Sequence, residues 1–187
     1  MKKSILLLSL LVSSFVFSQN FFWYDVLLEV EGKNASTVAG LVDGFYSNHP
    51  KPANVNVEFS SIPLKGANEK ATHIIGITSD SSESLADFRN SLKGPEWDLY
   101  ISKMSNYVKS NRAAAGRDLI TNGSKTDYPI GQAWVFKVNN TKVVSLVQAF
   151  GKLIKSNTFD GGFLAMGQIV HGTDNGESVY IYGTYSD

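Results

Sequence analysis

Apolar residues alternate with polar ones along short stretches of the first half of the chain, and elsewhere they recur at helical spacing. Three strands are predicted: residues 23–30 are mostly apolar, residues 54–59 alternate with a two-residue period, and residues 71–78 are apolar on both faces as a central strand is. Asn34 suits a helix N-cap after the first strand, and Pro50 ends that helix because proline disfavours a helical residue before it. The apolar stripe of this helix consists of Val38, Leu41, Val42 and Phe45.

An interrupted second helix follows the third strand. Asp80 and Glu83 have the spacing of a capping box, in which the two side chains satisfy backbone groups at a helix start. Gly94 and Pro95 break the helix, and the proline suits the first turn of a second piece. The stripe of that piece is Trp97, Tyr100, Ile101, Met104 and Val108. With a fourth strand expected at residues 112–121, the order is strand, helix, strand, strand, helix, strand.

A segment of the first half returns at the end of the chain. Residues 72–80 read THIIGITSD and residues 179–187 read VYIYGTYSD, so both place Gly-x-x-Ser-Asp after an apolar run. A spacing of 107 residues between the two segments is the length of a small domain and predicts a unit built twice. The second copy follows the same order, with a strand at 132–138, a helix at 141–156 and strands around 162–170 and 177–184.

The repeat predicts a division of the chain into a signal peptide at residues 1–18, a first unit at 19–124 and a second unit at 125–187. The copy stops at Asp187, which corresponds to Asp80, so we expect the second unit to lack its last helix and strand. A sheet without that helix would leave apolar surface bare, which favours the interpretation that the sequence is a fragment of a longer product.

The first residues have the pattern of a secretory signal. Lys2 and Lys3 precede an apolar stretch at residues 4–18, which is shorter than the roughly 20 residues of a membrane span. Cleavage before Gln19 would export the protein to the periplasm or the medium, with no membrane segment left. The remaining chain carries 15 basic and 17 acidic side chains (17 minus Lys2 and Lys3, against 17) and no basic stripe, which argues against nucleic acid as a partner.

The chain resembles the dimeric α/β-barrel superfamily, and in particular its antibiotic biosynthesis monooxygenase type. The resemblance consists of the tandem βαββαβ order, the broken second helix and the paired segments Gly76–Asp80 and Gly183–Asp187. The resemblance implies an α+β fold of two ferredoxin-like units, packed face to face as a pseudo-dimeric α/β barrel within one chain. It covers nearly the whole mature chain. Because the superfamily includes cofactor-independent oxygenases, haem-degrading enzymes and domains without known reaction, it does not select an activity.

Five residues are candidates for a ligand site: His73, Trp97, Trp134, Tyr180 and Tyr182. Among the three histidines, His73 is the best candidate because its neighbours in the strand are apolar, and burial would shift its pKa. The strand aromatics of the second copy, which include Tyr185, could line a pocket for a flat apolar molecule. The alternative is ordinary core packing, which we also expect of Trp97 in its helical stripe.

The sequence has no cysteine and no clustered acid, base or nucleophile, so it predicts no catalytic residue, no metal site and no cofactor. We expect no haem binding, since no histidine lies where an axial ligand is required. The favoured function is an exported non-catalytic or ligand-binding protein that takes a small apolar or aromatic molecule. The alternative is a cofactor-independent monooxygenase that acts on a small aromatic or polyketide-like molecule.

Overall fold

The computed structural model of the chain describes residues 21–123, 128–157, 162–173 and 175–186. The first half contains β1 (Phe22–Val30), a 3₁₀ turn (Gly32–Asn34), α1 (Ala35–Tyr46), β2 (Val55–Ser61), β3 (His73–Ser79), α2 (Ser82–Ser91), α3 (Pro95–Met104) and β4 (Val108–Gly123). The second half contains β5 (Ile130–Phe136), α4 (Asn140–Ser156), β6 (Phe163–His171) and β7 (Val179–Tyr185). The element order predicted from the hydrophobic pattern is therefore confirmed over these residues.

The seven strands form one continuous antiparallel sheet in the order β2-β3-β1-β4-β6-β7-β5. The expectation of one sheet for each unit was wrong, because β4 hydrogen-bonds β1 along one part and β6 along the other and so joins the two halves into one sheet. At 16 residues, β4 is long enough to serve both halves. It also includes Val108, which we had predicted to belong to the apolar stripe of the preceding helix. Helix α3 ends at Met104, and β4 begins at Val108 after a turn.

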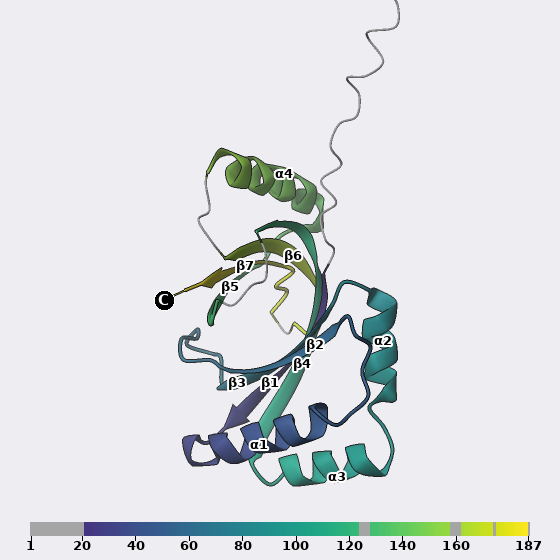
Figure 1. Cartoon of the computed structure of the whole chain (residues 1–187). Coiled ribbons are helices and arrows are strands. Elements are labelled where there is room, and N and C mark those ends of the chain that lie inside the picture. The colour runs from purple at the N-terminus through teal and green to yellow at the C-terminus, as the bar shows by residue number, and fades with distance from the viewer. Residues whose placement is uncertain (1–20, 124–127, 158–161, 174, 187) are drawn as a thin grey trace, which may run out of the picture.

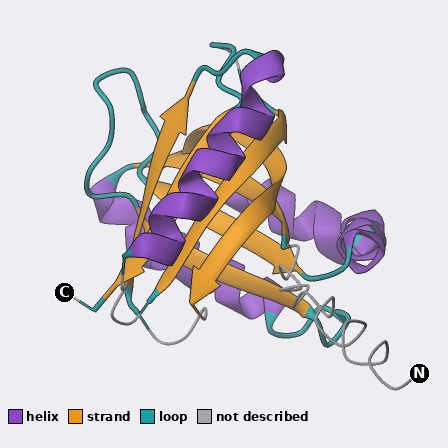
Figure 2. Cartoon of the chain, turned by 90° about the horizontal axis from the view of Figure 1, so that it is seen from above, coloured by secondary structure: helices purple, strands orange, loops and turns teal. Residues whose placement is uncertain are grey.

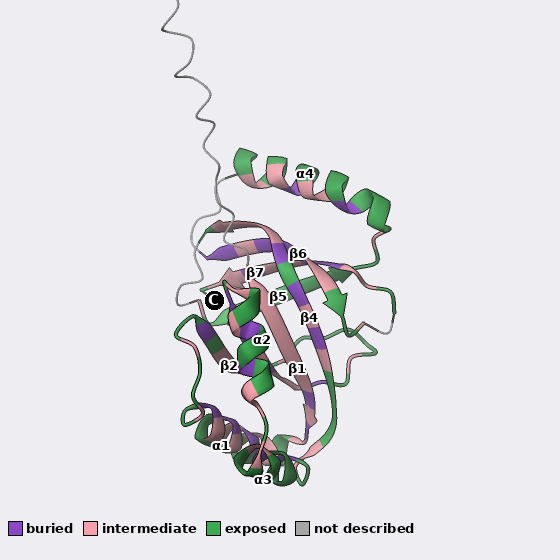
Figure 3. Cartoon of the chain, turned by 90° about the vertical axis from the view of Figure 1, so that its right-hand side faces the viewer, coloured by how far each residue is buried: buried purple, intermediate pink, exposed green. Residues whose placement is uncertain are grey.

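The sheet curls so that its two halves face each other across a concave side, with the helices on the outer side (Figure 1). Helices α1, α2 and α3 cover β1, β2 and β3 and enclose the larger core, which includes Val38, Val42, Ile75, Ile77, Phe88 and Tyr100. The single helix α4 covers the second half, where it lies over the strands (Figure 2). Its buried residues Val143 and Phe150 pack against Met166 and Val179, while its opposite side is exposed (Figure 3).

The helix caps differ in part from the sequence prediction. Pro95 does begin α3, as expected. Helix α2 is capped by Ser81, whose side chain accepts a hydrogen bond of 3.2 Å from the backbone N–H of Ser84. Asp80 instead accepts from the Asn54 amide at 2.7 Å. The capping box was therefore placed one residue too early, in a run where three consecutive residues can all cap.

Strands β2 and β5 are the edges of the sheet, and every residue of β5 is exposed. The order β6-β7-β5 in the second half corresponds to the order β2-β3-β1 in the first. The predicted signal peptide, residues 124–127 at the predicted boundary between the two units, and Asp187 lie outside the described residues. Within the described ranges, no helix has the length and apolar character needed to cross a membrane.

Candidate ligand pocket on the concave face

Alternation along β1 divides its side chains between the two sides of the sheet. Tyr24, Val26 and Leu28 pack toward the helices. The residues between them therefore face the concave side, and they are Trp23, Asp25, Leu27 and Glu29. The candidate site is built along this row.

Three side chains from three strands meet at one end of the concave face. The indole Nε1–H of Trp23 donates to the Tyr180 hydroxyl at 2.7 Å, and that hydroxyl donates to the Asp118 carboxylate. The Trp23 and Tyr180 rings also touch edge to face, 5.4 Å apart. Tyr180 is 6 % exposed and Asp118 5 % exposed, so this network joins β1, β4 and β7 away from solvent.

Glycines make room for the network. A Cβ at Gly167 would overlap the ring and hydroxyl of Tyr180, and a Cβ at Gly116 would overlap the Trp23 ring. Phe21 and Phe163 meet edge to face beside them at 6.1 Å, and Phe163 also contacts Tyr182. This end of the concave face is thus filled by packed side chains rather than open.

Nearby carboxylates change the pKa values of the two tyrosines of this face, Tyr180 and Tyr182. Burial raises the pKa of Tyr180, and the Asp118 carboxylate raises it further. Burial also raises the pKa of Tyr182, followed by the negative charges of Glu58, Asp25 and Asp118. Carboxylates of β1 and β4 therefore act on both phenol groups, and Glu58 of β2 acts on Tyr182 as well.

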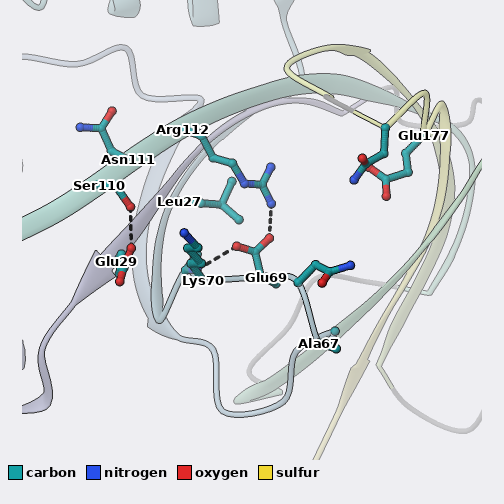
Figure 4. Close-up of a pocket in the computed structure, with 13 residues that line it drawn as sticks. Leu27, Glu29, Ala67, Glu69, Lys70, Ser110, Asn111, Arg112 and Glu177 are labelled. Carbon is teal, nitrogen blue, oxygen red and sulfur yellow. Dashed lines mark hydrogen bonds and ion pairs between the residues drawn. The ribbon is translucent and has the colours of Figure 1, made fainter.

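A pocket of about 500 Å³ lies at the other end of the same face (Figure 4). Its walls come from β1, the β2–β3 loop, β4 and the β6–β7 loop, and include Leu27, Glu29, Glu69, Lys70, Ser110, Arg112 and Glu177. Four separate segments of the chain thus build it. Leu27 lies in the same row of β1 as Asp25 and Trp23, which stand two and four residues earlier, so the pocket and the buried network share one face of the sheet.

An ion pair fixes one wall of the pocket. Arg112 of β4 pairs with Glu69 of the β2–β3 loop, and the two side chains point toward each other (Figure 4). Glu69 also accepts from the backbone N–H of Ala71 at 2.8 Å. Burial alone would raise the pKa of Glu69, but the hydrogen bonds from Ala71 and Arg112 lower it below its usual value. On the same strand as Arg112, the Ser110 hydroxyl donates to Glu29 of β1 at 2.8 Å.

The structure brings together only two of the five candidate residues from the sequence. Tyr180 and Tyr182 lie on the concave face, opposite Gly167 and Ala165. Trp134 pairs with Ile181, which packs toward α4, so Trp134 lies on the outer side of β5 and is 38 % exposed.

His73 and Trp97 lie on the helix side of the first half. His73 stacks on Phe59 at 5.2 Å and its Nδ1 contacts the Thr72 hydroxyl at 2.9 Å. Burial lowers the pKa of His73, as its apolar strand predicted. Trp97 packs against Phe45 and Tyr100, each 5.4 Å away, in the aromatic part of the core. Their roles in ligand binding stay predictions, but neither lies at the concave pocket.

Sequence reasoning missed Trp23, Asp118 and Arg112, which build the site. Trp23 was assigned only to a strand, and Asp118 and Arg112 to another. The available signal was a carboxylate within an otherwise apolar strand segment, Asp118-Leu119-Ile120, since a buried carboxylate needs partners. Among the described residues, no group of three or more His, Cys, Asp or Glu side chains could hold a metal ion.

Comparison with known proteins relates this architecture to solved structures. No family model matches the chain, and no curated protein matches it in sequence. An anthrone oxidase-like protein superposes with a TM-score of 0.62 at 12% identity, over 91% of this chain and 75% of its own. A proposed monooxygenase from Lactobacillus acidophilus gives 0.60 at 10% identity, over 90% and 78%. A third, from Fusobacterium nucleatum, gives 0.59 at 10% identity, over 91% and 77%.

The chain has the fold of these monooxygenase-like proteins. It is the fold that we expected from the order of elements. At 10–12% identity the likeness concerns the fold alone.

Proposed function

We propose that the protein binds a small organic molecule in the concave pocket and that binding, without catalysis, is its primary role. The observation that carries this proposal is the pocket of about 500 Å³, which is built by four segments of the chain. Its size is in the range of sites for small ligands, roughly 300–1,000 Å³.

The arrangement of side chains favours binding over chemistry. Tyr180 and Asp118 are polar side chains on this face, but both are almost fully buried and hydrogen-bonded to each other. Their positions suit a rigid back wall. A reacting group needs to reach its substrate, and the groups at the pocket itself form an ion pair and a hydroxyl–carboxylate contact.

A variant that fills the pocket tests the proposal. Leu27→Trp adds an indole to the floor of the pocket, and Leu64→Trp adds the same group to an exposed loop residue as a matched control. A thermal-shift screen of small aromatic molecules, with haem as a comparison, identifies ligands of the unaltered protein. We expect Leu27→Trp to abolish binding of those ligands, and Leu64→Trp to leave it unchanged, while haem gives no specific binding.

Ser110→Leu fills the same pocket from β4 and replaces Leu27→Trp if that variant does not fold. Circular dichroism establishes the fold of each variant. Ligands that bind equally well to both pocket-filling variants would show that they bind elsewhere, and the proposal would fail.

A second candidate is a cofactor-independent oxygenase that acts on a small aromatic or polyketide-like molecule. It is favoured by the pocket on a fold shared with an anthrone oxidase-like protein and with proposed monooxygenases. Oxidation of an aryl methylene group to a carbonyl by molecular oxygen, with release of water, balances without a cofactor. Oxygen consumption with an anthrone as substrate tests it; consumption that Leu27→Trp removes would replace the binding role by an enzymatic one.

Two further parts of the proposal concern organisation. We propose that residues 19–124 and 125–187 are duplicated units, which is supported by their matching strand orders. We also propose that the protein works outside the cytoplasm after loss of residues 1–18. N-terminal sequencing of the protein recovered from the periplasm or medium tests the export, and a first residue other than Gln19 would revise the cleavage site.

A further inference from the structure

Two Asn-Gly sequences occur in the chain, and the fold places them in opposite surroundings. Asn122 and Gly123 end β4, whereas Asn175 and Gly176 lie in the loop between β6 and β7. Asparagine is most prone to spontaneous deamidation before glycine, which has no side chain to hinder attack of its backbone nitrogen on the asparagine amide. The two sites therefore share one intrinsic chemistry, and the structure decides between them.

The site at the end of β4 is held in the sheet. Asn122 pairs with Leu164 of β6, and Gly123 pairs with Phe163. Extended strand backbone, with ψ of about +135°, points the following nitrogen away from the side-chain amide carbon. The surroundings are also close, since a Cβ at Gly123 would overlap the carbonyl of Gly162. Ring closure at this site therefore requires the strand pairing to open first.

The site in the β6–β7 loop is free of these restraints. Asn175 and Gly176 are both exposed and lie outside the strand ladders. Among the described residues, neither the Asn175 side-chain amide nor the Gly176 N–H has a hydrogen-bond partner. A Cβ at Gly176 would meet no atom within 4 Å, so the space beside the attacking nitrogen is open. The reacting groups can thus approach each other without unfolding any element.

We infer that Asn175 is a modification site, at which the folded protein deamidates spontaneously while Asn122 is protected. The backbone nitrogen of Gly176 loses its proton to hydroxide and attacks the side-chain carbonyl carbon of Asn175. The new C–N bond closes a succinimide ring, and the amide nitrogen leaves as ammonia. Water then opens the ring to aspartate or isoaspartate. The net change is uptake of water and release of ammonia, which requires no oxidant or cofactor.

The modification changes the wall of the concave pocket. Asn175 and Glu177 both line the pocket from the β6–β7 loop. Deamidation replaces a neutral amide by a carboxylate two residues before Glu177, so this wall gains a negative charge. Isoaspartate also lengthens the main chain of the loop by one carbon. The pocket of an aged molecule therefore differs in charge from that of a newly made one, whether or not the proposed binding function holds.

Peptide mapping by mass spectrometry measures both sites in one sample of the purified full chain, incubated folded in mildly alkaline buffer. We expect Asn175 to deamidate at least about tenfold faster than Asn122, because the strand must first open locally. Slightly acidic buffer should slow the reaction at Asn175, since the attacking nitrogen has to lose a proton. Guanidinium chloride removes the strand, so both sites should then react at similar rates.

Two variants connect the chemistry to the charge of the whole protein. Asn175→Gln keeps an amide at an exposed position but disfavours the reaction, because the ring it would close is larger. This variant should lose the acidic species that isoelectric focusing detects in the aged folded protein. Asn122→Gln is the matched control and should retain that species. Circular dichroism establishes that both variants are folded.

Equal rates at the two sites of the folded protein, or no reaction at Asn175, would overturn the inference. A difference in rate that persists in guanidinium chloride would assign it to the neighbouring sequence rather than to the fold, and would overturn it as well. The proposed binding function fails separately, when ligands found in the screen are unaffected by Leu27→Trp, because the deamidation measurement uses no ligand.

Discussion

Removal of one hydroxyl at the centre of the concave network tests how much it contributes to stability. Tyr180→Phe keeps the ring and deletes the group that accepts from Trp23 and donates to Asp118. Tyr180 and Asp118 are almost fully shielded from solvent, and Trp23 is part-buried. A hydrogen bond to a charged group contributes about 1.5–3 kcal/mol, and a buried donor left without its acceptor costs about 1–3 kcal/mol. We therefore expect a loss of about 3 kcal/mol in the free energy of unfolding.

Tyr182→Phe is the matched control, two residues along the same strand and on the same face. Its hydroxyl makes no hydrogen bond with another described residue, so this variant should change stability by less than about 0.5 kcal/mol. Urea unfolding followed by circular dichroism measures both free energies. For a chain of this size, about 3 kcal/mol corresponds to a decrease in Tm of about 6–12 °C.

A double-mutant cycle with Asp118→Ala, which removes the acceptor, separates the hydrogen bond from the other effects of each substitution. We expect the two changes to be strongly non-additive, with a coupling of about 1–3 kcal/mol, because they remove the same contact. Additive effects, or a loss below about 1 kcal/mol for Tyr180→Phe, would refute the reasoning. In that case the network would be a consequence of packing rather than a stabilising element.

The two remaining predictions concern the helix side of the first half. Trp97→Ala should lower the free energy of unfolding in urea by about 2 kcal/mol and leave ligand affinity unchanged. The loss is smaller than the roughly 3–5 kcal/mol of a fully buried aromatic because Trp97 is only part-buried. A variant that loses ligand affinity while its Tm stays unchanged would assign Trp97 to a binding site. His73, whose pKa is lowered by burial, is held neutral by folding, so stability should fall as pH decreases below about 6.5 toward the folded pKa. An NMR titration gives that pKa, and His73→Phe should flatten this part of the pH dependence; an unchanged slope would contradict it.

Local structure could be predicted from the sequence because it depends on neighbours in the chain. The stripe Val38, Val42 and Phe45 identified α1, and the alternation along residues 54–59 identified β2, each to within a few residues, since helix and strand periods are local. The end of α3 was harder to predict: Val108 fits the helical stripe but belongs to β4. Pairing with β1 decides its conformation, and that contact is distant in sequence.

Sequence also identified the order of elements and the two tyrosines of the site. The concave face depended on tertiary structure, because register decides which side of a strand each residue faces. Trp134 and Tyr180 both read as strand aromatics, yet their strands place them on opposite sides of the sheet. The joining of β4 to β6 into one curled sheet brings Trp23 beside Tyr180, 157 positions later in the chain. No local pattern records that contact, since only the folded sheet brings the two residues within hydrogen-bond distance.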